Sequence, residues 1–315
     1  MKVALCGLWH VHAADYFNHA VALGEVVGVY EENEQWRNDF CKEHNVQPIL
    51  SFEELLASDA EGVIVCTATD AHVDVMVKLA DAGKHIFTEK VLALTDEGAA
   101  KVEEAVKRNG VKFVISLPWK YNASQIAVHE IAAGGELGKL NYLRFRNCHS
   151  GTLDNWLPAH FYNAKECGGG AMIDLGAHGM YLTDWICGQP VSAASMFTKS
   201  CDDAELNVDG VEDNAVTVMG FANGCIAVNE TGFVSRGYPS SLEVGGEKGY
   251  VRADNNGVVK CTADTDYKPV VVKVGENQPS PIDQFLTGNI LPGCGMEEAK
   301  RLTHLMVMAY GNRAK

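Results

Sequence analysis

The chain opens with the sequence MKVALCG at residues 1–7, and the interpretation of its first third begins there. The apolar residues 3–6 predict a short strand, and Gly7 follows at once as a tight turn. Residues 13–23 then predict a helix. A strand, a glycine turn and a helix in this order favour an α/β fold with a parallel sheet.

The same alternation continues outward from this unit to about residue 117. Ser51 and Glu54 form a capping-box pattern that opens a short helix, and Thr95 caps a longer one. Short apolar runs predict strands at residues 26–30, 63–66, 86–88 and 111–116. The residues between these runs predict helices at 34–43, 71–83 and 95–110. Continuous apolar strands separated by helices indicate a parallel sheet that is covered on both faces.

The pattern changes after Pro118. Helices are expected at residues 124–133, 171–187 and 297–310, and strands at 140–146, 215–221, 225–231, 241–244, 250–253 and 270–274. Consecutive strands without crossover helices predict a mainly antiparallel sheet. We therefore expect two domains, an α/β domain over residues 1–117 and an α+β domain with a large, mainly antiparallel sheet over residues 118–315.

Composition excludes several classes of partner. The 315 residues are 47% hydrophobic and carry a formal net charge of −15, which disfavours nucleic acid and anionic membranes. No apolar run approaches the roughly 20 residues of a membrane span, and the first strand leaves no room for a signal peptide. The ten cysteines form no C-x-x-C pair, so we expect reduced thiols and a cytoplasmic protein.

Gly7 lies where a Rossmann fold points backbone N–H groups at a dinucleotide pyrophosphate. The usual G-x-G-x-x-G pattern is incomplete, because Trp9 and His12 replace its second and third glycines. Glu31 lies 24 residues after Gly7, where a carboxylate receives the adenosine ribose hydroxyls and repels a 2′-phosphate. NAD is therefore expected in preference to NADP. The alternatives are an ordinary strand-to-helix turn and a solvated acid.

Three further motifs stand in order along the chain. They read VIVCTATDAH at residues 63–72, AGKHIFTEK at 82–90 and GGGAMIDLGAH at 168–178. Together they resemble the T-P-N-x-x-H, G-K-H-V-x-x-E-K-P and G-G-G-x-x-x-D-x-G-x-H patterns of the Gfo/Idh/MocA oxidoreductase family. The resemblance spans nearly the whole chain, since residues 138–140 and 245–249 also fit it.

The resemblance implies a Rossmann domain that binds NAD. The cofactor-binding residues that it implies, with those expected from the loop itself, are Gly7, Leu8, Trp9, His10, Val11, Glu31, Cys66, Thr67, Ala68, Asp70, His72, Glu89 and Lys90. Ala68 departs from the family pattern, and so does Val91, which replaces a proline. Losing that proline removes a fixed φ and easy access to a cis bond.

Alcohol oxidation by a nicotinamide needs a base for the hydroxyl proton. Asp174 and His178 are four residues apart on one expected helix and share a face, so the carboxylate can orient the imidazole. The resemblance implies that Lys90 joins them and stabilises the alkoxide. His178 is favoured as the base, although Lys90 is the alternative. The competing interpretations are a structural histidine and a solvated lysine.

Substrate contacts are expected from five residues, each with a core or surface role as the alternative. They are Lys120, Arg144, His149, Trp156 and His160. A tryptophan face suits the C–H face of a sugar ring. His10 and His12 invite a metal interpretation, but spacing places no third ligand, so no metal is expected.

These observations favour an NAD-dependent oxidoreductase acting on a hydroxyl carbon of a small sugar, polyol or sugar acid. One alternative is an NAD-using glycosidase or lyase that oxidises its substrate transiently. Another is a non-catalytic sensor of NAD or a ligand, which the incomplete glycine pattern and Val91 favour. An apolar outer face of the second sheet, as the resemblance implies, favours a homodimer or homotetramer.

Overall fold

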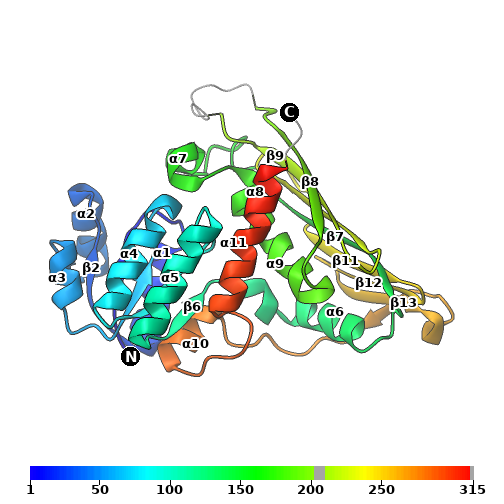
Figure 1. Ribbon diagram of the computed structural model, residues 1–315, viewed down its shortest axis with the longest axis horizontal. Helices are drawn as coiled ribbons and strands as arrows, with labels where there is room; N and C mark the ends of the chain where they lie inside the picture. The colour runs from blue at the N-terminus through cyan, green and yellow to red at the C-terminus, as the bar shows by residue number, and fades with distance from the viewer. Residues whose placement is uncertain (202–209, 313–315) are drawn as a thin grey trace. The chain divides into compact units, whose positions relative to one another are not determined.

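The computed structural model describes residues 1–201 and 210–312, which divide into two compact units (Figure 1). The first unit comprises Met1–Leu117 and Pro279–Thr303, and the second comprises Pro118–Gln278 and His304–Lys315. The expectation of one continuous second domain over residues 118–315 is thus wrong, because Pro279–Thr303 packs with the first unit. Within the described residues, no helix has the length and apolarity that crossing a membrane requires.

The described part of the first unit contains a parallel sheet of six strands in the order β3-β2-β1-β4-β5-β6. Its strands are β1 (Lys2–Cys6), β2 (Glu25–Tyr30), β3 (Pro48–Ile49), β4 (Gly62–Val65), β5 (His85–Thr88) and β6 (Phe113–Ile115). The predicted parallel Rossmann sheet is confirmed. The two-residue β3 was not expected, since so short a strand leaves no periodic signal.

Five helices of the first unit lie where local signals predict them. They are α1 (Ala13–Leu23), α2 (Glu34–His44), α3 (Phe52–Ala57), α4 (His72–Asp81) and α5 (Asp96–Asn109), and α10 (Pro281–Thr287) is a further helix of this unit. Thr95 caps α5 through Gly98 N, and Gly110 ends it with φ +63°. Ser51 accepts from Glu54 N as expected, but the Glu54 carboxylate binds Leu50 N, so no reciprocal capping box forms.

The helix α10 was not predicted, and it explains why the late segment returns to the first unit. Its residue Phe285 is fully buried, and a Cβ on Gly62 of β4 would lie only 2.8 Å from the Phe285 ring. The aromatic side chain therefore packs directly against the start of a central strand. A burial of this kind contributes roughly 1.5–3 kcal/mol.

The second unit is built on a described sheet of eight strands in the order β14-β13-β12-β11-β7-β10-β9-β8. Its strands are β7 (Leu140–Cys148), β8 (Ser192–Thr198), β9 (Asn214–Gly220), β10 (Ile226–Gly232), β11 (Ser241–Gly246), β12 (Gly249–Asp254), β13 (Gly257–Thr262) and β14 (Val270–Val272). All neighbours are antiparallel except β7 and β10. The mainly antiparallel sheet is confirmed, although β8 and β13 were not predicted.

Helices cover one face of this sheet (Figure 1). They are α6 (Ala123–Ala133), α8 (Ala171–Asp174) and α9 (Gly176–Cys187), with α7 (Ala164–Cys167) nearby in sequence. The covered face carries the fully buried Leu143 and Phe145 of β7. Asn229 of β10 faces the same way, because its amide donates to Gly176 O at 2.7 Å. The opposite face carries the alternate residues of each strand, including Arg144.

The last helix, α11 (Met296–Gly311), contributes residues to both units. The helix expected over residues 171–187 is divided at Leu175, so α8 and α9 are separate elements. His178 N donates to Leu175 O at 3.2 Å, a tighter i−3 contact. Asp174 and His178 therefore belong to two short helices, not to one.

Candidate active site

The loop after β1 is shaped by Gly7. Its φ is +88°, and a Cβ at this position would lie 2.7 Å from the backbone nitrogen of Thr67. Only glycine fits this approach of two loops. Gly7 N donates to Tyr30 O at 2.8 Å, and His10 N donates to Cys66 O at 3.0 Å. The structure thus brings together the loops after β1 and β4, as expected for a dinucleotide site.

Glu31 directly follows the neighbouring strand β2 and is 9% exposed. Its carboxylate accepts from Leu8 N at 2.7 Å and from Asn33 N at 2.8 Å. Arg37 donates to the Glu31 carbonyl at 2.7 Å, which fixes the backbone of the same residue. The carboxylate therefore organises the Gly7 loop in addition to lying where ribose hydroxyls are expected.

Four other expected cofactor residues lie in the loops after β1 and β4, namely Val11, Thr67, Ala68 and Asp70. Thr67 Oγ1 is buried, and none of the described residues gives it a hydrogen bond. A buried hydroxyl of this kind needs a hydrogen-bond partner, which water or a polar ligand at the loop would supply. Ala68 and Asp70 lie in or beside the 3₁₀ turn Thr69–Ala71, and Val11 is 46% exposed.

His72, expected to bind cofactor, is 1% exposed at the start of α4. Its Nδ1–H donates to the Val91 carbonyl at 2.8 Å. The side chain therefore anchors the turn that carries Lys90. Burial lowers the pKa of His72, partly offset by the backbone contact to Val91. The Lys90–Val91 peptide is cis although Val91 replaces the family's proline.

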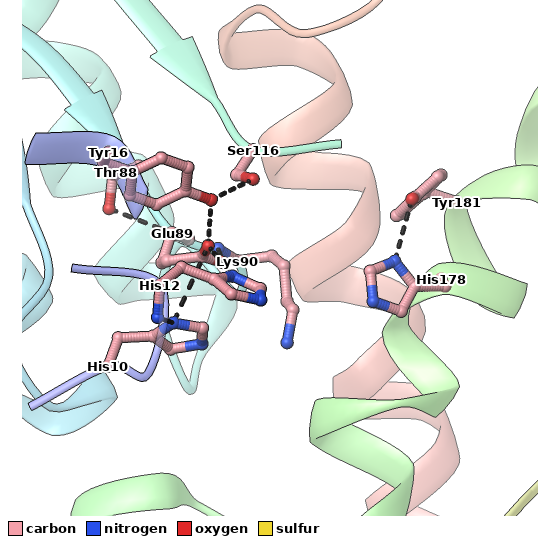
Figure 2. A network of polar contacts seen from close by, with 9 residues as sticks. All are labelled: His10, His12, Tyr16, Thr88, Glu89, Lys90, Ser116, His178 and Tyr181. Carbon is pink, nitrogen blue, oxygen red and sulfur yellow. Dashed lines mark hydrogen bonds and ion pairs between the residues drawn. The ribbon is translucent and has the colours of Figure 1, made fainter. Parts of the chain in front are cut away.

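Glu89 is the centre of a polar cluster in the first unit (Figure 2). Its side chain is 1% exposed, and Oε1 accepts from Tyr16 OH and lies 2.8 Å from His12 Nδ1. His10 Nδ1 lies 3.7 Å from the same oxygen. Glu89 Oε2 accepts from Lys90 N at 3.0 Å.

The charges around this carboxylate decide its ionisation. Burial opposes ionisation of Glu89, but His10, His12 and Lys90 overcome it and hold the pKa well below its usual range. Burial, with the charge of Glu89, raises the pKa of Tyr16 well above its usual range. Tyr16 also contacts Ser116 Oγ at 2.8 Å. Glu89 is thus a buried carboxylate among donors and cations.

In the second unit, His178 lies near the start of α9 and is 8% exposed. Its Nδ1 lies 2.9 Å from Tyr181 OH (Figure 2). The imidazole also stacks on the Trp119 indole at a ring distance of 5.3 Å and an angle of 19°. Trp119 N donates to Tyr181 OH at 3.2 Å, which fixes the phenol. The sequence-based expectation that Asp174 orients His178 stays a prediction, and sequence reasoning did not identify Tyr181, three residues after the histidine.

Asp174 acts on a different histidine as well. Burial lowers the pKa of His149, and the Asp174 carboxylate opposes that shift. His149 Nδ1 accepts from Gly151 N at 3.0 Å, and its ring stacks on Phe233 at 5.0 Å. Trp156 packs against the same imidazole at 4.6 Å and is 54% exposed. The structure thus brings together three of the sequence-predicted residues, Asp174, His149 and Trp156.

Three other expected substrate residues lie elsewhere in the second unit. Lys120 is buried, with its ammonium 5.5 Å from the centre of the Trp185 ring. Arg144 lies on the sheet face opposite α9 and donates twice to the Glu230 carboxylate, at 2.9 and 3.0 Å. The His160 ring packs beside Phe161 at 5.3 Å. The Arg144 side chain therefore lies on the other face of the sheet from His178 of α9.

The glycines before α8 have a packing role that sequence reasoning missed. A Cβ on Gly169 would lie 2.0 Å from Tyr310 OH, and one on Gly170 would lie 2.1 Å from Glu212 O. Glu212 Oε1 accepts from Gly170 N at 3.0 Å and from Tyr310 OH at 2.6 Å. These partners are distant in sequence, so no local pattern could reveal them.

Family models match both halves of the chain. Residues 1–117 match an oxidoreductase family with an NAD-binding Rossmann fold, and residues 126–252 match the GFO/IDH/MocA C-terminal domain. The chain belongs to the Gfo/Idh/MocA oxidoreductase family. The expected family is confirmed, and residues 1–117 form its NAD-binding Rossmann domain.

Two relatives align with part of this chain. Myo-inositol 2-dehydrogenase of Thermotoga maritima is 27% identical over 198 residues, which are 62% of this chain and 57% of the relative. The 1,5-anhydro-D-fructose reductase of Ensifer adhaerens is 26% identical over 228 residues, 72% of this chain and 67% of the relative. The matched region thus spans little more than half of the first relative and two thirds of the second.

Solved structures share the fold over the whole chain. The WlbA dehydrogenase from Bordetella pertussis, in complex with NADH and UDP-GlcNAcA, has a TM-score of 0.79 at 19% identity and covers 99% of this chain and 96% of that chain. The aldose-aldose oxidoreductase from Caulobacter crescentus has a TM-score of 0.82 at 18% identity, with 99% and 97% covered. At these identities the likeness establishes the Gfo/Idh/MocA fold alone.

Proposed function

We propose that this protein is an NAD-dependent oxidoreductase that transfers hydride between nicotinamide and a hydroxyl-bearing carbon of a sugar, polyol or sugar acid. The observation that carries this function is the pairing, in one chain, of an NAD-binding Rossmann domain with the GFO/IDH/MocA C-terminal domain. Related proteins include an inositol dehydrogenase and an anhydrofructose reductase. Their names support a polyhydroxylated substrate.

His178 is assigned the exchange of the hydroxyl proton. To act as a base it must carry a lone pair on Nε2, so Nδ1–H must donate to Tyr181. The Tyr181 oxygen lies 2.9 Å from Nδ1 and suits this role. Asp174, the last residue of α8, is assigned the orientation of this imidazole together with Tyr181, and Lys90 is assigned stabilisation of the alkoxide. NAD, when bound, supplies the hydride acceptor.

The half-exposed Trp156 is assigned a place beside the substrate. Its ring packs against His149, so the indole is held in one orientation while 54% of the residue stays accessible. An indole face matches the apolar C–H face of a sugar or cyclitol ring. Lys120 and His160 remain proposals for the same role, whereas Arg144 is already paired with Glu230.

The decisive test is a screen of the purified protein with NAD⁺ against polyols, aldoses and uronic acids, following nicotinamide absorbance. Reduction of NAD⁺ by at least one class is expected. Substrate turnover without net reduction would instead indicate a glycosidase or lyase with transient oxidation. NAD binding without turnover of any compound would favour a sensor.

We further propose that the protein is a homodimer or homotetramer joined through the outer face of the second sheet. Met196, Val218 and Ile226 lie on that face and are 62%, 41% and 46% exposed. Contiguous exposed apolar side chains mark interaction surfaces. Val218→Lys is expected to convert the oligomer to monomers in light scattering, and an unchanged mass would contradict this interface.

The proposed compartment is the cytoplasm. The described cysteines are all free thiols, which suits a reducing, cytoplasmic compartment.

A further inference from the structure

His10, His12 and Glu89 converge in the first unit. One nitrogen from each imidazole and one carboxylate oxygen all lie within 4.8 Å of one another, the arrangement of a metal-ligand group. Two of the three come from the loop after β1, and Glu89, which is 77 residues beyond His12, directly follows β5. Spacing along the chain could not supply this third group, which is why the sequence alone indicated no metal.

The distances suit a small divalent ion. His12 Nδ1 and His10 Nδ1 lie 2.8 and 3.7 Å from Glu89 Oε1. Ligands bound at about 2.0–2.2 Å in tetrahedral geometry are separated from each other by roughly 3.3–3.6 Å. The two observed distances lie on either side of that range, so an ion requires His12 to move away from the carboxylate by about half an ångström or more. The two imidazole nitrogens lie within 4.8 Å of each other, and His10 Nδ1 accepts from His12 N at 3.3 Å, a contact that an ion bound at this nitrogen would replace.

The carboxylate is also held as metal-binding carboxylates are. Tyr16 OH donates to Glu89 Oε1, and Lys90 N donates to Oε2 at 3.0 Å. Ser116 in turn contacts Tyr16 OH at 2.8 Å. Hydrogen bonds of this outer layer orient ligands and raise the affinity of a site.

The cluster is closed on one side and accessible on the other. His10 and Glu89 are 6% and 1% exposed, whereas the His12 side chain is 44% exposed. An ion could therefore enter beside His12, and water could complete its coordination. Three protein ligands with an open position are the pattern of reactive zinc sites, including sites with two histidines and one glutamate.

We propose that His10, His12 and Glu89 form a binding site for a divalent transition-metal ion of the Zn²⁺ class. Imidazole and carboxylate together favour Zn²⁺ over Mg²⁺ or Ca²⁺, which prefer all-oxygen sites. The site does not rest on the proposed oxidoreductase function. All three ligands belong to the first unit, and ion binding is measured without NAD or substrate.

The experiment titrates the full-length, chelator-treated protein with Co²⁺, followed by visible absorption, and with Zn²⁺ in a calorimeter. One equivalent of Co²⁺ is expected, without the near-ultraviolet charge-transfer band that thiolate ligands produce. His12→Ala changes a half-exposed residue and should keep the fold, as circular dichroism would verify. Its affinity for either ion should fall on the order of 100-fold or more, because the loss of an outer-layer partner alone costs about 10- to 100-fold. Glu89→Gln should have a similar effect.

The matched control is His19→Ala. His19 of α1 also pairs with a carboxylate, since its Nδ1 lies 2.6 Å from Asp283 of α10, but it belongs to no three-group cluster in the described residues. Its loss should leave ion affinity unchanged. The site is ruled out if wild-type protein takes up no stoichiometric ion or if His12→Ala and Glu89→Gln bind as wild type. A thiolate band would place the ion at cysteines and also overturn it.

Discussion

The surroundings of Glu89 and of His178 are built in opposite ways. Glu89 is fully buried among His10, His12 and Lys90, and these charges hold it ionised. His178 is also buried, but the side chains that pair with its Nδ1 and stack on its ring are the neutral Tyr181 and Trp119. A buried carboxylate among opposite charges is fixed in its ionised form. The packing around His178 instead fixes the orientation of its ring, and the proposed function gives this imidazole the exchange of a proton.

The largest effect is expected on kcat, when the proposed general base His178 is removed. His178→Ala should lower kcat by on the order of 10² or more, because general acid–base catalysis contributes 10²–10⁴-fold. The dissociation constant for NAD⁺ should change little, since the side chain lies outside the Rossmann unit. Steady-state kinetics and NAD⁺ titration by fluorescence would measure the two quantities.

His129→Ala is the control for this comparison. His129 is a second histidine of the same unit, stacked on Trp185 at 3.9 Å, and the proposed mechanism gives it no role. Its loss should reduce kcat far less. An equal loss of kcat in the two variants would mean that His178 acts through packing. The contrast between a proton-exchanging His178 and an ionised Glu89 would then be wrong.

The next effect concerns Glu31, the fixed charge beside the Gly7 loop. Glu31→Ala should weaken NAD⁺ binding on the order of 10- to 100-fold, because hydrogen bonds to a charged group contribute about 1.5–3 kcal/mol. The same change removes repulsion of a 2′-phosphate, so the ratio of NADP⁺ to NAD⁺ affinity should rise. Glu32→Ala, an exposed neighbour, should alter neither value. An unaltered cofactor preference in Glu31→Ala would show that its carboxylate only organises the loop.

Local signals in the sequence predicted most of the first unit and much of the second. Thr95 and Gly110 bound α5 as expected, because capping is encoded by residues within one turn. The strand β8 was missed, since its residues 192–198 read SAASMFT with small residues where a buried face would show. The periodicity of α8 and α9 was read as one helix because Leu175 keeps helical dihedrals between them.

The candidate site was harder to predict than the fold. Sequence reasoning located His178 and Glu31 from motif positions, but their partners come from contacts between distant segments. Glu89 meets Tyr16 across 73 residues, and Glu212 meets Tyr310 across 98. Such pairs leave no periodic signal, so only the fold reveals them.

A smaller effect is expected from the neutral partner of His178. Tyr181→Phe removes the oxygen that accepts from Nδ1–H while keeping the ring, so the base loses its tautomer preference. We expect kcat to fall about 10-fold, with KM little changed and the acidic limb of the pH profile displaced. Tyr162→Phe removes a buried hydroxyl that pairs with Thr152 in the same unit and serves as the control. A Tyr181→Phe pH profile identical to wild type would assign Tyr181 to packing alone.

The smallest effect concerns stability and the turn that carries Lys90. Burial lowers the pKa of His72 below its unfolded value of 6.5, so the unfolded chain binds a proton that the folded chain does not. The stability of this unit should therefore be fully present above pH 6.5 and should fall as the pH drops below it, by at most about 1.4 kcal/mol per pH unit. His72→Asn keeps a donor for the Val91 carbonyl but removes the titration. Urea unfolding at pH 7.5 and 5.5 should give a smaller difference for His72→Asn than for wild type. An equal stability difference in both proteins would mean that His72 gains a proton freely in the folded state. The first unit would then contain a histidine that changes its protonation state as well as the ionised Glu89.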